Sequence, residues 1–153
     1  MTVTFFGHRT TPPEIADILR KELISLIETQ GADTFYVGHQ GAFDAMVRKT
    51  LKELKKHYPF ISYAVVLAYL PQKRNEYDTF DDTIYPEGLE TVPKKYAISH
   101  RNRWMVEQCD CVVAYVAFTD GGAAQFVRLA EKKGKQIRNL ADPPSKHLLS
   151  AAP

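Results

Sequence analysis

The sequence has few cysteines and no long apolar run, and each shortage excludes a class of protein. Of its 153 residues only Cys109 and Cys111 are cysteines, and their separation is too short for an ordinary disulfide between packed elements. No histidine cluster at zinc-finger spacing accompanies them, so we expect buried, reduced thiols and no metal site. No apolar stretch reaches the length of a membrane span, so no membrane partner is expected.

An excess of charge of one sign is also missing. Twenty Lys and Arg residues face 18 Asp and Glu residues, for a net charge of +2. A nucleic-acid or membrane surface usually carries a strong basic excess, so net charge predicts neither partner. The start of the chain lacks the basic and apolar regions of a signal peptide, which favours a cytoplasmic location.

The composition that remains is that of one globular domain. The chain is 44% hydrophobic and 25% charged, and about 150 residues suffice for a single core. We expect one domain over residues 1–140, with no cofactor, and a tail over residues 141–153 that contains two adjacent prolines.

Strand-like and helix-like patterns alternate along this domain. Apolar or β-branched runs predict strands at residues 2–6, 32–37, 60–70, 111–118 and 136–140. Helical periodicity separates them, and Thr11 and Glu14 have capping-box spacing, so the first helix should begin there and end at Gly31. Ile18 is expected on the inner stripe of that helix. Residues 72–92 contain six acidic residues and predict either a lid or an acidic surface excursion.

This alternation predicts an α/β fold, a three-layer sandwich with a mainly parallel five-stranded sheet. Right-handed crossovers most simply give the strand order 3-2-1-4-5. In that order the first and fourth strands are neighbours, and a ligand crevice is expected between their carboxyl ends.

Three glycine-containing loops should meet at this crevice, and an arginine from the third helical pattern should join them. Glycines and helix N-termini suit a phosphate-binding loop, because unpaired N–H groups and the helix dipole favour an anion. The expected ligand-binding residues are Gly7, His8, Arg9, Gly38, His39, Gln40, Gly41, Asp44, Arg101, Thr119, Asp120, Gly121, Gly122 and Ala123.

Several of these residues have more than one interpretation. His8 and His39 suit hydrogen bonding to a ligand or acid–base chemistry near neutral pH. Asp44 and Asp120 are candidate catalytic or ribose-binding carboxylates, with helix-dipole pairing and turn formation as the alternatives. The helical pattern turns Ile98 and Met105 inward and leaves Arg101, the third catalytic candidate, on another face.

The ordered set of motifs resembles the SLOG superfamily, in particular its YpsA-like branch. The resemblance covers residues 2–140 and rests on Gly7 to Arg9, the G-x-x-G-x-F-D loop that starts at Gly38, the R-x-x-x-M helix from Arg101, and the glycine pair at Gly121. It implies a Rossmann-like domain that binds a nucleotide or a nucleotide-derived ligand. A homodimer is also implied, because the related LOG enzymes are dimers.

The LOG branch of the superfamily consists of phosphoribohydrolases, and here the sequence departs from its pattern. In the P-G-G-x-G-T-x-x-E motif Gly121 and Gly122 match, whereas Asp120 replaces the proline and Arg128 occupies the position of the catalytic glutamate. Cleavage of an N-glycosidic bond needs a carboxylate near the oxocarbenium-like transition state. Whether the protein is an enzyme is therefore left open.

Three functional hypotheses follow. The first is a sensor or sequestering module for a nucleotide or phosphoribosyl ligand. The second is a nucleotide N-glycosidase with a relocated carboxylate. The third is a single-stranded nucleic-acid binder, since the superfamily includes the DNA-processing protein DprA, although the balanced charge disfavours it.

Overall fold

The structure is a computed structural model that describes residues 1–141, so all of the expected tail over 141–153 except its first residue lies outside the described residues. The described residues form ten α-helices and β-strands, together with two short 3₁₀ helices, Leu89–Thr91 and Lys94–Tyr96. In chain order they are β1 (Thr2–Gly7), α1 (Ile15–Gln30), β2 (Thr34–Val37), α2 (Gly41–His57), β3 (Ser62–Val66), β4 (Thr83–Ile84), α3 (Ala97–Gln108), β5 (Cys111–Tyr115), α4 (Gly122–Lys132) and β6 (Gln136–Asn139).

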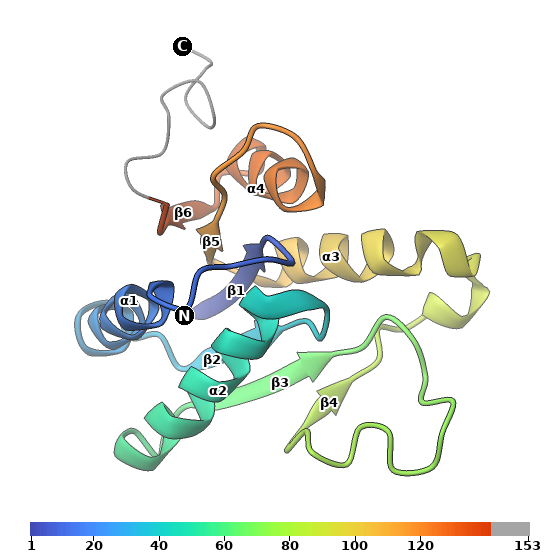
Figure 1. The fold of residues 1–153 in the computed structure, drawn as a ribbon, viewed down its shortest axis with the longest axis horizontal. Coiled ribbons are helices and arrows are strands. Elements are labelled where there is room, and N and C mark those ends of the chain that lie inside the picture. Colours follow the sequence, from blue (N-terminus) through green and yellow to red (C-terminus); the bar gives the residue numbers. More distant parts are fainter. Residues whose placement is uncertain (142–153) are drawn as a thin grey trace.

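The strands form one parallel sheet in the order β4-β3-β2-β1-β5-β6 (Figure 1). The predicted order of five strands lies within it as β3-β2-β1-β5-β6, and β1 and β5 are neighbours as expected. The predicted count of five was wrong because β4 adds an edge strand. Only two residues long, it pairs with β3 from within an acidic, irregular stretch that gives no strand pattern.

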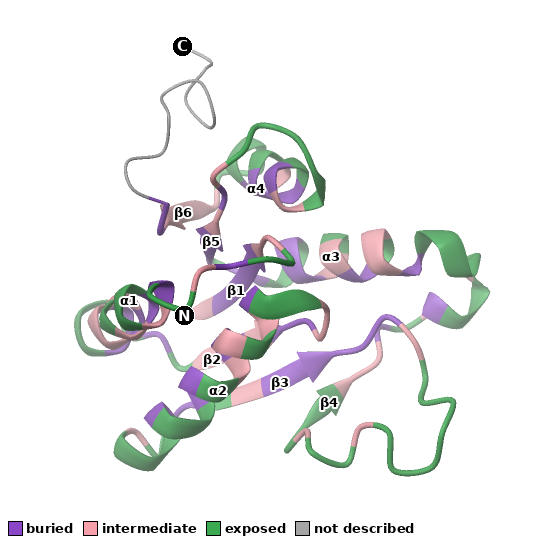
Figure 2. Ribbon diagram, viewed as in Figure 1, coloured by how far each residue is buried: buried purple, intermediate pink, exposed green. Residues whose placement is uncertain are grey.

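Alternate residues of the strands face two separate cores. Val3, Phe5 and Val113 point towards α1 and α2, whereas Phe6 and Val112 point towards α3 and α4. This is the period-2 alternation of a strand, applied to a sheet that is covered on both faces. Figure 2 shows the result, with β3 and β5 largely buried and the long excursion between β3 and β4 largely exposed.

The first helix differs from its prediction at both its start and its stripe. Thr11 does not cap it: the Thr11 hydroxyl donates to the carbonyl oxygen of His8 at 2.9 Å, and the helix begins at Ile15. Ile18 is 43% exposed and not on the inner stripe. The helix does end at Gly31, whose N–H donates to the carbonyl oxygen of Leu26 in a left-handed cap.

The two cysteines are free and buried, as expected. Burial raises the pKa of Cys109 to about 11 and that of Cys111 to about 12, so both remain thiols at neutral pH. Within residues 1–141 no helix combines the length and apolar character that crossing a membrane requires.

We predict that Gly7→Ala destabilises the protein by about 1–3 kcal/mol, because a Cβ at Gly7 would collide with the Phe43 ring. Gly122→Ala is the matched control, since a Cβ there meets nothing within 4 Å, and its effect should stay within about 0.5 kcal/mol. Urea unfolding measures both. Equal midpoints for the two variants would contradict the close packing of α2 on β1.

Candidate functional site

A cavity of about 330 Å³ lies at the carboxyl edge of the sheet, where β1 and β5 are adjacent. It is formed by the end of β1, the loop between β2 and α2, one face of α3 and the start of α4. Its lining residues are Phe5, Phe6, Gly7, His8, Arg9, Gln40, Asp44, Ile98, Arg101, Asn102, Met105, Gly122 and Ala123. The crevice expected from strand order alone therefore exists, and it has the size of a small-molecule site.

Arg101 is the central side chain of the cavity, and it is only 2% exposed. Its Nη1 donates to the carbonyl oxygen of Val66 at the end of β3 (2.9 Å), and its Nη2 donates to Gln40 Oε1 (2.7 Å). Its Nε donates to Asn102 Oδ1 (2.8 Å). Burial lowers the pKa of Arg101, an effect that the nearby Asp44 carboxylate opposes. The expectation that Arg101 lies away from the inner face was wrong.

The Asp44 carboxylate and the Arg101 guanidinium both lie against Gly38. A Cβ built on Gly38 would stand 2.7 Å from Asp44 Oδ2 and 3.0 Å from Arg101 Nη1, so glycine is required for this close approach. The Gln40 N–H donates to Asp44 Oδ2 at 3.0 Å. Burial raises the pKa of Asp44, while this hydrogen bond and the Arg101 and Arg48 charges oppose the rise.

Two hydrogen bonds join the loop after β1 to its neighbours. The Ala117 N–H, just after β5, donates to His8 Nε2 at 2.9 Å. The Ala42 N–H, at the start of α2, donates to the carbonyl oxygen of Arg9 at 2.8 Å. Burial lowers the pKa of His8, so its ring is neutral at pH 7 and accepts at Nε2. The three predicted loops are thus linked by one bond between backbone groups and one bond from the backbone to the His8 ring.

The start of α4 contributes Gly122 and Ala123 to the cavity. The first N–H groups of a helix lack partners within it, and the helix dipole makes this end attractive to anions. Asp120 is exposed and lies outside the cavity lining. Arg128 turns back, and its Nη1 donates to the carbonyl oxygen of Thr119 at 2.8 Å.

His39 lies outside the lining of this cavity and contacts the excursion between β3 and β4. The Ala68 N–H donates to His39 Nε2 at 3.3 Å, and the rings of Tyr77 and Phe80 pack edge-on at 5.3 and 6.1 Å. Burial, reinforced by Arg101 and Arg48, lowers the pKa of His39 to about 4. His39 is therefore neutral at pH 7 and acts as an acceptor for the backbone.

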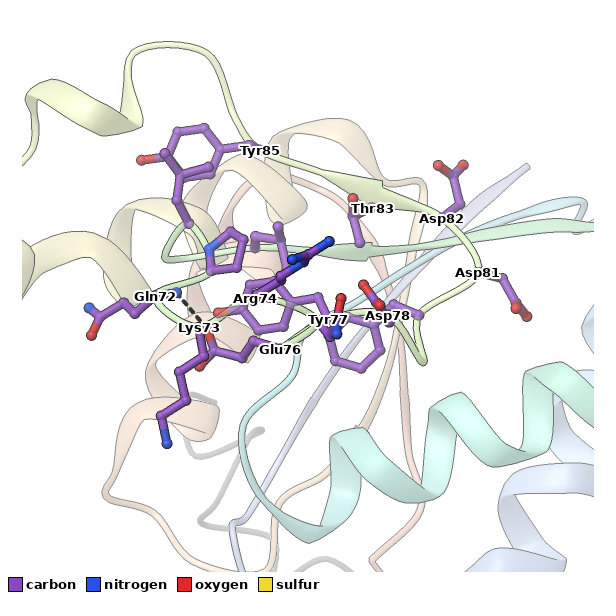
Figure 3. Close-up of a pocket in the computed structure, with 15 residues that line it drawn as sticks. Gln72, Lys73, Arg74, Glu76, Tyr77, Asp78, Asp81, Asp82, Thr83 and Tyr85 are labelled. Atoms are coloured by element: carbon purple, nitrogen blue, oxygen red, sulfur yellow. Dashed lines mark hydrogen bonds between the residues drawn. The ribbon is translucent and has the colours of Figure 1, made fainter.

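The excursion encloses a second, larger hollow of about 930 Å³. Figure 3 shows its polar lining, including Lys73, Arg74 and Asp78, with the Gln72 N–H donating to Glu76 Oε2 at 2.7 Å. Side chains of both charge signs line this hollow, so positive charge is not concentrated there as it is by Arg9 and Arg101 in the first cavity. Among residues 1–141 no group of three or more His, Cys, Asp or Glu side chains is placed to hold a metal ion.

Eight predicted residues line the cavity and six do not. Those in the lining are Gly7, His8, Arg9, Gln40, Asp44, Arg101, Gly122 and Ala123; those outside it are Gly38, His39, Gly41, Thr119, Asp120 and Gly121. Sequence reasoning missed five lining residues as site residues: Phe5, Phe6, Ile98, Asn102 and Met105. For those in α3 the signal was present, because residues 98, 101, 102 and 105 share one face of a helix.

We predict that Arg101→Lys destabilises the protein by about 3 kcal/mol or more, because an ammonium at this buried position cannot reach three separated acceptors. Arg103→Lys, an exposed change two residues away, should shift stability by less than about 0.5 kcal/mol. Thermal unfolding would test this pair. Similar melting temperatures for both variants would mean that the Arg101 contacts do not stabilise the fold.

We predict a pH dependence of stability that comes from His39. Its folded pKa of about 4 lies below the unfolded value of 6.5, so the unfolded state gains the proton first as the pH falls. Stability from this group is complete above pH 6.5 and is lost between pH 6.5 and about 4. His39→Gln keeps an acceptor without titrating, and urea midpoints at pH 7 and 4.5 should differ less for this variant. An unchanged pH difference would contradict the assignment.

Comparison with known proteins gives similarity at the level of structure. No protein-family model matches the sequence, and no curated protein matches it either. DNA processing protein A (DprA) from Streptococcus pneumoniae is similar with a TM-score of 0.70 and 16% identity, over 99% of this chain and 56% of that one.

A second solved structure, described as showing the single-stranded DNA binding mode of DprA from Helicobacter pylori, has a TM-score of 0.64 and 17% identity, over 91% of this chain and 64% of that one. The chain thus spans less than two thirds of either relative. At such low identity the similarity shows the fold alone, which is the Rossmann-like α/β arrangement of these proteins.

Proposed function

We propose that the cavity between β1 and β5 binds a nucleotide or a nucleotide-derived phosphoribosyl ligand, and that the chain is a YpsA-like member of the SLOG superfamily that senses or sequesters it. The observation that carries this proposal is the convergence of Arg9, Arg101 and the first residues of α4 on one cavity at the carboxyl edge of the sheet. A phosphate there would meet two guanidinium groups and the unpaired N–H groups of a helix N-terminus.

The Arg101 contacts support a binding role. Of its five N–H donors, three are bonded to Val66, Gln40 and Asn102, and each Nη atom keeps one further N–H. The fixed contacts hold the guanidinium in place, so little side-chain entropy is lost when a ligand binds. Arg9 is exposed and supplies a second charge at the rim.

The glycosidase alternative would depend on Asp44 as its acid. Among residues 1–141 it is the one carboxylate that lines this cavity, so of the two predicted carboxylates the relocated acid would be Asp44 and not Asp120. Burial raises its pKa, which suits an acid more than a base. If the protein is an enzyme, Asp44→Asn should abolish release of free base from a nucleoside monophosphate.

We predict that Gly122→Asp separates ligand binding from stability. A carboxylate in the first turn of α4 stabilises the helix by about 0.3–1 kcal/mol, yet it repels a phosphate in the cavity. Calorimetric titration with nucleoside monophosphates and ADP-ribose should show binding to the wild type and at least tenfold weaker binding to Gly122→Asp and Arg9→Ala. Arg103→Ala is the matched control and should bind normally.

Two other outcomes would change the assignment. Absence of heat and of a thermal shift with every ligand of the panel would refute the small-molecule proposal. Binding that is restricted to oligonucleotides, and that weakens steeply with salt, would favour the single-stranded DNA alternative. The single-stranded DNA binding of the Helicobacter pylori protein is the observation that favours this second candidate.

A further inference from the structure

An exposed aromatic ring stands beside the cavity and has no role in the core. Phe118 follows β5 by three residues and is 62% exposed. Its ring lies at 5.0 Å from the ring of His8, which itself lines the cavity. Single exposed apolar side chains are common on protein surfaces, so exposure alone does not indicate a function for Phe118, and only its position beside the cavity can indicate one.

The neighbours of Phe118 are fixed in place. The Ala117 N–H donates to His8 Nε2, and Tyr115 packs against the same imidazole ring at 5.7 Å, nearly perpendicular to it. Because His8 accepts at Nε2, its neutral ring carries the hydrogen on Nδ1. Phe118, His8 and Tyr115 therefore form an aromatic wall whose outer member has a free face.

Phe118 and the proposed phosphate-binding end belong to one short loop. Phe118 precedes Gly122 by four residues, and the loop between them runs from the end of β5 to the first turn of α4. The Arg128 side chain holds this loop through the carbonyl oxygen of Thr119. A ligand with its phosphate at Gly122 would have Phe118 on the same side of the crevice.

We propose that Phe118 is the base-stacking residue of the site, and that its ring, supported by His8, accepts the face of a nucleobase whose phosphate lies at the start of α4. This inference rests on the proposed function and extends it from the phosphate to the base. Stacking uses the π-face that every base presents, so the residue supplies affinity for nucleotides over sugar phosphates without selecting one base.

The test compares Phe118→Ala with Phe60→Ala, a substitution of an equally exposed phenylalanine (66%) that precedes β3, at the amino end of the strands. The ligands are nucleoside monophosphates and ribose 5-phosphate, which lacks a base. Phe118→Ala should bind nucleoside monophosphates about tenfold more weakly and ribose 5-phosphate as the wild type does, because base–aromatic stacking contributes an effect of that order. Phe60→Ala should bind both ligands normally.

A second variant gives a direct signal. Phe118→Trp should retain affinity and show fluorescence quenching on addition of nucleoside monophosphate, whereas Phe60→Trp should not. The wild type, with its single tryptophan at Trp104, supplies the background.

The inference is wrong if Phe118→Ala binds nucleoside monophosphates as tightly as the wild type while Arg9→Ala does not, and the phosphate site then stands alone. If the wild type binds neither nucleoside monophosphates nor ribose 5-phosphate, the proposed function and this inference fail together.

Discussion

The buried guanidinium of Arg101 is the constraint on which the candidate site depends. A charge that is 2% exposed is unfavourable unless hydrogen bonds and an opposite charge compensate for lost hydration. Here α3 supplies the charge, and the end of β3, the loop after β2 and Asn102 supply the acceptors. One side chain therefore fixes three segments that lie far apart in the sequence. Since Gln40 is among them, the orientation of the loop that leads to Asp44 follows from the same contacts.

Glycine makes this convergence sterically feasible. Gly38 has Asp44 and Arg101 against the position of its missing Cβ, and Gly7 has the Phe43 ring there. Any larger residue at either position would push α2 or the guanidinium away from the sheet. In the sequence these glycines look like loop formers with freedom of conformation. In the structure their main role is to let side chains from α2 and α3 approach the strand ends.

The parts of the fold that could be predicted are those set by periodicity and connectivity. Alternating strands and helices were enough to place β1 beside β5 and so to locate the crevice between Gly7 and Gly122. Two kinds of feature were missed: very short elements, and buried charges that tertiary contacts compensate. β4 is too short to show a pattern. The helical pattern placed Arg101 on another face than the inward Ile98 and Met105, because burial of a charge depends on acceptors that only the tertiary structure brings together. Thr11 was assigned to a helix cap on local spacing, whereas its hydroxyl bonds to His8.

By the resemblance to the LOG pattern, Arg128 stands where that pattern has its catalytic glutamate, and the structure shows which contact this arginine makes. The Arg128 side chain folds onto its own loop, where its Nη1 donates to the carbonyl oxygen of Thr119. The residue thereby supports the segment that leads from Phe118 to Gly122. Among residues 1–141 Asp44 is the single carboxylate in the cavity lining, and burial raises its pKa, so under the proposed function the fixed donors of Arg101 would recognise the anion.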